Sequence, residues 1–109
     1  GNKRLPFLTA MMGRERRARF TASLERAQIH GYVKAHFSSF NHMFRAVEQD
    51  VGIALVPDII SMPDTLRVIR PEGRDDIFAP SDICMVTLKN FKSPSRVDDW
   101  IRGYFAENR

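Results

Sequence analysis

Hydroxyl-bearing residues stand at two points where an apolar, strand-like segment gives way to a helix-like one. Thr9 follows "LPFL", and Ser38 and Ser39 follow the alternating stretch "HGYVKAHF". In an α/β sheet such points lie at the carboxyl ends of strands, where hydroxyl groups and the free amides of a helix N-terminus can bind an anion. Both points are therefore candidates for holding a small carboxylate. The alternatives are that Thr9 is a simple turn residue and that the serines only cap the next helix.

Catalytic and metal-binding groups are sparse in this sequence. His30, His36 and His42 fall on a predicted turn, strand and helix, and no two have the i, i+4 spacing on one helix that favours a metal site. The single cysteine, Cys84, cannot form an internal disulfide, and Gly13 stands alone where a phosphate-binding loop needs clustered glycines. We therefore expect no enzyme activity, no metal site and no cofactor, and we interpret the histidines as ordinary core or surface residues.

The composition is that of a soluble globular protein. The chain has 109 residues, of which 43% are hydrophobic and 28% charged, enough for one ordinary domain with a core. No stretch approaches the roughly 18 apolar residues that a membrane span requires, and the start lacks the apolar middle of a signal peptide. We therefore expect a cytoplasmic protein with no membrane partner.

The positive charge of the chain is concentrated at one end. The net charge is +4, and residues 1–26 hold seven basic residues against two acidic ones. The basic run "RERRARF" lies on a predicted helix without a recognition-helix pattern or interleaved aromatic residues. This favours a solvated or partner-facing helix flank over a nucleic-acid interface.

Hydrophobic periodicity predicts strands that alternate with helices. A strand at 5–8 breaks into a loop at 9–13. Further strand-like segments are 30–37, 51–56, 66–70 and 82–90, and helix-like ones are 14–28, a segment that begins at 40, and 93–109. In the strand 30–37 the alternation places Val33, Ala35 and Phe37 on one face.

The segment Val51–Val56 decides the fold class. It carries no charge, so both of its faces must be covered, and Pro57 ends it because proline lacks the N–H that a continuing ladder needs. Together with the alternation of strands and helices, this predicts an α/β fold with a mostly parallel sheet flanked by helices.

Three stretches of the chain occur in the order found in the carboxyl-terminal half of LysR-type transcriptional regulators: "SSFNHMFRAVEQDVGIALVP", "LRVIRPEG" and "ICMVTLKNFKSPSRVDDWIRGYF". The chain resembles that family over nearly its whole length. Gly52–Pro57 matches the family's buried strand Gly-Ile-Ala-Leu-(Leu or Val)-Pro, and Ser93 and Pro94 match its Ser-Pro helix start. Asp50 stands where the family usually has glycine, at a helix end that prefers a left-handed backbone, so we expect a local cost in stability.

The resemblance implies a periplasmic-binding-protein-like (type II) sensor with two α/β subdomains and an effector cleft between them. Residues 1–69 would be the second effector-binding subdomain, largely complete, and 70–81 a crossover linker. Residues 82–109 would supply the C-terminal strand and helix of the first subdomain, which is truncated. The helix-turn-helix that binds DNA would be absent from this chain.

By the same resemblance the chain would sense a small-molecule effector, which we expect to be an organic anion, and would form a homodimer or a higher homo-oligomer. DNA would be a partner only through the missing domain. A fragment of a transporter's solute-binding protein is the alternative, because it shares this architecture. Carried over position by position, the family's effector contacts fall on Thr9, Met11, Met12, Gly13, Ser38 and Ser39.

Overall fold

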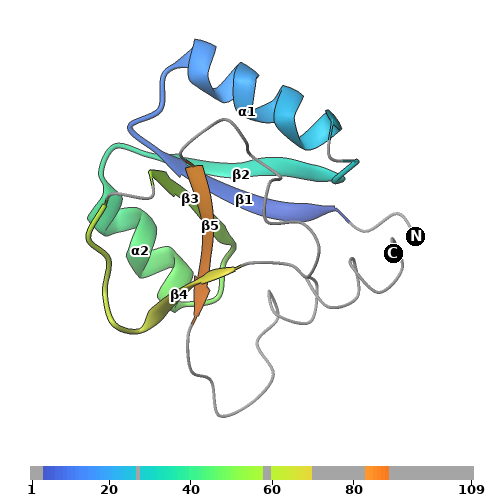
Figure 1. The fold of residues 1–109 in the computed structure, drawn as a ribbon. Coiled ribbons are helices and arrows are strands. Elements are labelled where there is room, and N and C mark those ends of the chain that lie inside the picture. Colours follow the sequence, from blue (N-terminus) through green and yellow to red (C-terminus); the bar gives the residue numbers. More distant parts are fainter. Residues whose placement is uncertain (1–3, 27, 58–59, 70–82, 89–109) are drawn as a thin grey trace.

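The computed structural model describes residues 4–26, 28–57, 60–69 and 83–88, which form a five-stranded sheet and two helices (Figure 1). In chain order the elements are β1 (Leu5–Ala10), α1 (Arg14–Arg26), β2 (Gly31–Phe37), α2 (Phe40–Glu48), β3 (Ile53–Pro57), β4 (Leu66–Ile69) and β5 (Ile83–Leu88). The predicted α/β class is confirmed. Neither of these helices is long and apolar enough to cross a membrane.

The sheet is mixed, with the strand order β2-β1-β3-β5-β4. β1 pairs in parallel with both β2 and β3, whereas β5 runs antiparallel to its neighbours β3 and β4. β1 to β4 therefore point one way and β5 points the other. The predicted mostly parallel sheet holds for these four strands, and β5 is the exception.

β5 belongs to the same sheet as the strands of residues 5–69, in which it lies between β3 and β4. Its register runs from Ala54 opposite Val86 to Pro57 opposite Ile83, so four consecutive residue pairs join β5 to β3. The division into subdomains 1–69 and 82–109 stays a prediction of the resemblance. The predicted linker 70–81 and the helix 93–109 lie outside the described residues.

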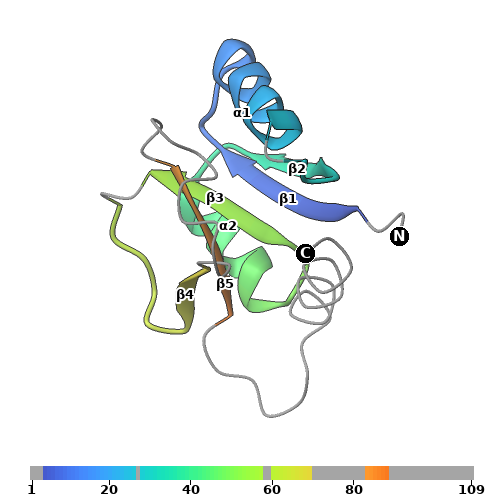
Figure 2. The same ribbon diagram turned by 45° about the vertical axis from the view of Figure 1, so that its right-hand side comes forward.

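The two helices cover opposite faces of the sheet (Figure 2). Successive residues of β1 point to opposite faces. Phe7 packs edge-on against Phe20 of α1, with ring centroids 5.4 Å apart and an interplanar angle of 79°. Its neighbour Leu8 belongs to the core cluster that contains the buried side chains of α2. The chain passes from β1 through α1 to β2, and from β2 through α2 back past β1 to β3, so the two crossovers run in opposite directions along the sheet. Crossovers of the same handedness that run in opposite directions place their helices on opposite faces.

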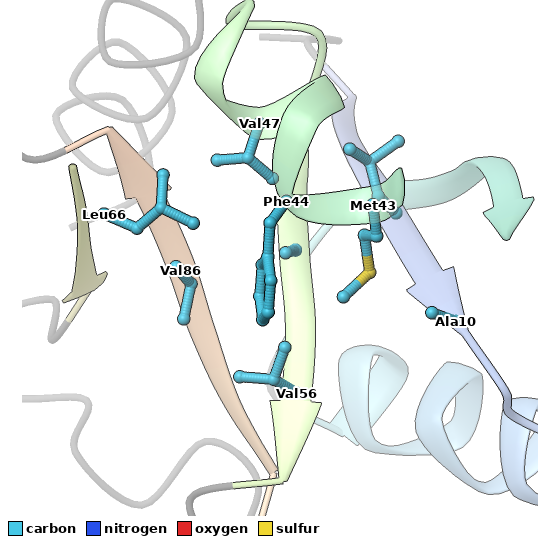
Figure 3. Packing of buried hydrophobic residues seen from close by; sticks show 9 residues of the cluster. Ala10, Met43, Phe44, Val47, Val56, Leu66 and Val86 are labelled. Atoms are coloured by element: carbon cyan, nitrogen blue, oxygen red, sulfur yellow. The ribbon is translucent and has the colours of Figure 1, made fainter. Parts of the chain in front are cut away.

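The core under α2 is a single apolar cluster (Figure 3). α2 contributes Met43, Phe44 and Val47, and Phe40 packs against the cluster with part of its surface exposed. Together these four side chains form a stripe at i, i+3, i+4 and i+7 on one face of the helix. The sheet contributes Leu8, Ala10, Ala54, Val56, Leu66 and Val86. Each fully buried large side chain contributes about 1.5 to 3 kcal/mol relative to exposure, so this cluster fixes α2 on the sheet.

β3 is the enclosed central strand that the charge-free segment predicts. It is third in the five-strand order, and its residues from Ile53 to Val56 are at most 1% exposed. Just before it, a Cβ on Gly52 would lie 2.9 Å from Leu8 Cγ and 3.0 Å from the carbonyl oxygen of Pro6. Glycine at this position lets β3 approach β1 closely enough to pair.

α2 ends in a Schellman motif with Asp50 in the left-handed conformation. The φ angle of Asp50 is 60°, its N–H donates to the carbonyl of Val47, and the N–H of Val51 donates to the carbonyl of Ala46. The prediction that this position adopts a left-handed backbone is confirmed. α1 ends in the same motif, with Gln28 at a φ of 59°.

The predicted face of Val33 in β2 is wrong. Val33 lies opposite Phe7 and Ala35 opposite Leu8, so the register shifts by one residue at Lys34. Such a bulge places an extra residue in one strand and reverses the alternation beyond it. Val33 is therefore exposed on the face opposite to Ala35, which packs against the core cluster under α2.

Candidate functional site

The strand order creates a topological switch point at β1. From β1 the chain passes through α1 to β2 on one side, and from β2 it passes through α2 to β3 on the other side. Since β1, β2 and β3 are parallel, their carboxyl ends share one edge of the sheet (Figure 1). Ligands of open α/β sheets bind outside this edge, at the switch point. The loops 11–13 and 38–39 both lie there.

Thr9 does not begin the loop, as the sequence suggested, but lies within β1. The strand continues through Ala10, because Thr9 pairs with His36 and Ala10 with Phe37. The side chain of Thr9 is 0% exposed, and its Oγ1 lies 2.6 Å from Nδ1 of His36. The hydroxyl of Thr9 is therefore engaged with the imidazole and is not presented to solvent.

The three residues of the β1–α1 loop have different environments. Met11 is 65% exposed and has a φ of 52°, while its N–H donates to the carbonyl of Phe37 and so extends the β1–β2 ladder by one bond. Met12 is buried, and Gly13 is exposed with its carbonyl accepting from the N–H of Arg17. Of the predicted contacts in this loop, Met11 and Gly13 face solvent, whereas the side chain of Met12 belongs to the core.

The two serines after β2 also differ. Ser39 is the N-cap of α2, in an extended conformation, and its Oγ accepts from the N–H of His42 at 3.2 Å. The capping role that the sequence left open is therefore confirmed for Ser39. Ser38 is exposed. Of the two hydroxyls, the Ser38 hydroxyl is the one presented at the sheet edge.

His36 is a candidate that the sequence interpretation missed. It is exposed near the carboxyl end of β2, two residues before Ser38, and contacts Thr9. The pairing depends on the bulge at Lys34, since an unbroken alternation would give β2 a different register against β1. The sequence feature that could have identified His36 is its position near the end of a predicted strand that leads into a candidate loop.

The electrostatics of this edge favour a negative partner. The first turn of α1 contains Glu15 as its acidic residue, against Arg14, Arg16 and Arg17. Cations near a helix N-terminus add to the positive end of the helix dipole, so an anion placed there is favoured by both. Arg14 follows Gly13 in the chain and is exposed.

These groups are suited to binding an anion. Within the described ranges no group of three or more His, Cys, Asp or Glu side chains is placed to hold a metal ion. Cys84, on β5, is partly buried. Hydroxyl, imidazole, amide and guanidinium groups along one edge are the hydrogen-bond donors that recognise an oxyanion.

Comparison with known proteins adds no identification. No family model matches the chain, and neither the curated proteins nor the solved structures yield a match. The fold class therefore comes from the structure, and the family resemblance depends on the quoted sequence stretches alone.

Proposed function

We propose that this chain is the effector-binding part of a LysR-type transcriptional regulator and that it binds a small organic anion at the carboxyl edge of β1 and β2. In this proposal the sheet is one half of a periplasmic-binding-protein-like (type II) sensor. The observation that carries the proposal is the meeting of the loops 11–13 and 38–39 at the switch point beside β1.

The chemistry of the edge supports an anionic ligand. The exposed hydroxyl of Ser38 and the first amides of α1 and α2 are donors, and Arg14 adds a positive charge. The exposed side chain of Met11 supplies apolar surface, which would suit an aromatic or aliphatic acid.

Effector binding would act through conformation. An effector held between two subdomains stabilises one angle between them, because it makes contacts in that state that it lacks in others. In a homodimer or higher homo-oligomer this angle would set the spacing of DNA-binding domains that lie outside these 109 residues. The chain itself would contact no DNA and catalyse no reaction.

Thermal unfolding with acetate, succinate and benzoate tests the proposal. A ligand present at 100 times its Kd stabilises the folded state by about 2.7 kcal/mol, which raises Tm by several degrees. Ser38→Ala should weaken binding by about tenfold or more, since a hydrogen bond to a charged group contributes about 1.5 to 3 kcal/mol.

Thr65→Ala is the matched control, because Thr65 is exposed and its hydroxyl donates to Glu48 at 2.7 Å, before β4. It should leave the ligand-induced shift unchanged. Undiminished binding by Ser38→Ala would remove Ser38 from the site, and the absence of any shift with all three acids would contradict the proposal.

A further inference from the structure

The contact between Thr9 and His36 joins a fully buried group to an exposed one. Thr9 Oγ1 and His36 Nδ1 are 2.6 Å apart, Thr9 is 0% exposed, and His36 is exposed. The two residues are direct neighbours across β1 and β2, near the ends of both strands. A buried hydroxyl thus fixes one side of the ring of a residue that is otherwise exposed.

The direction of this hydrogen bond follows from burial. The hydroxyl of Thr9 carries one proton, and its contact with Nδ1 is its one side-chain hydrogen bond in the part of the chain that the structure describes. If Nδ1–H were the donor, the hydroxyl proton would be left buried without an acceptor, which is costly. The hydroxyl therefore donates to Nδ1, and the proton of the neutral ring resides on Nε2.

We propose that His36 binds the ligand by donating a hydrogen bond from its Nε2–H. Thr9 is a positioning residue that fixes the tautomer and orientation of the ring. Nε2 points away from Nδ1, so its N–H is directed to the exposed side of the ring. This N–H is suited to donate a hydrogen bond to a carboxylate oxygen. This inference rests on the proposed anion site, to which it adds one hydrogen-bond donor two residues before Ser38.

The same arrangement assigns Thr9 an indirect role. Its hydroxyl is enclosed and already engaged, so it would not touch the ligand. A residue that sets which nitrogen of a histidine carries the proton governs whether the ring offers a donor or an acceptor. Loss of Thr9 should therefore change recognition without removing any contact to the ligand.

Nitrogen-15 NMR of the histidine rings tests the tautomer without any ligand. In the wild-type protein, neutral His36 should carry its proton on Nε2 with almost no Nδ1–H form. In Thr9→Val the fraction of the Nδ1–H form should rise to that of exposed His42 in the same spectrum, and Thr9→Ser, which keeps the hydroxyl, should restore the wild-type pattern. A dominant Nδ1–H form, or a Thr9→Val spectrum equal to the wild type, would overturn the inference.

A binding measurement with acetate, succinate and benzoate tests the role of Nε2–H. His36→Ala should weaken binding by about tenfold or more, since the lost hydrogen bond is to a charged carboxylate. His36→Gln should retain most of it, because its amide N–H can replace Nε2–H. Equal binding by wild type and His36→Ala would overturn the inference while leaving the anion site in place. If the wild type binds none of the three acids, both the anion site and the proposed role of His36 are overturned, whatever tautomer the NMR spectra show.

Discussion

At the scale of single residues, two buried threonines differ in whether their hydroxyl group forms a hydrogen bond. The hydroxyl of Thr9 is hydrogen-bonded to His36, whereas Thr87, on β5, is 1% exposed and its Oγ1 has no hydrogen-bond partner among the residues that the structure describes. Leaving such a group buried and unpaired costs about 1 to 3 kcal/mol. Thr87 therefore lowers stability, while Thr9 uses its hydroxyl to hold a neighbour.

We predict that Thr87→Val stabilises the protein. Valine has nearly the same shape and removes the unpaired hydroxyl, so the free energy of unfolding should rise by about 1 kcal/mol. Thr9→Val is the matched comparison and should lower it, because a formed hydrogen bond is lost. Urea unfolding followed by circular dichroism measures both. A less stable Thr87→Val variant would show that the hydroxyl has a partner in solution.

At the scale of elements, both helices end on residues that are not glycine in a position that favours glycine. Gln28 after α1 and Asp50 after α2 have φ angles of 59° and 60° within Schellman motifs. A side chain in this conformation is strained by contact between Cβ and the backbone. An aspartate at the negative end of the helix dipole adds an unfavourable charge.

Asp50→Gly should accordingly raise the stability of the protein, by about 0.5 to 1 kcal/mol. Asp50→Ala, which removes the charge but keeps Cβ, separates the two causes and should remain below Asp50→Gly in Tm. Differential scanning calorimetry gives the ranking. If Asp50→Ala equalled or exceeded Asp50→Gly, backbone strain would not be the reason for the cost.

Element boundaries also show what sequence could and could not predict. The apolar stripe of α2 and the charge-free segment of β3 could be recognised in the sequence, because each pattern depends only on the residues of the element itself. The face of Val33 was not, because it depends on a bulge formed against β1. The extension of β1 through Thr9 was missed for the same reason, as its partners His36 and Phe37 lie 27 residues further along the chain.

At the scale of the whole molecule, sheet order is the feature that local patterns could not predict. β5 is inserted antiparallel between β3 and β4, although it comes last of the five in the chain. Nothing in "ICMVTL" specifies its neighbours, since an apolar strand fits several sheet positions. The candidate site was predicted as far as its loops, while the Thr9–His36 contact required the register.

The whole-molecule claim is that one edge of the sheet, formed by the loops after β1 and β2, binds an organic anion. Titrating benzoate into nitrogen-15-labelled protein and following the assigned backbone amides tests it most directly. We predict saturable shifts concentrated at residues 12–15 and 38–42. Shifts centred on the opposite edge, near Gly52 and Thr65, or none up to saturating benzoate, would contradict the account.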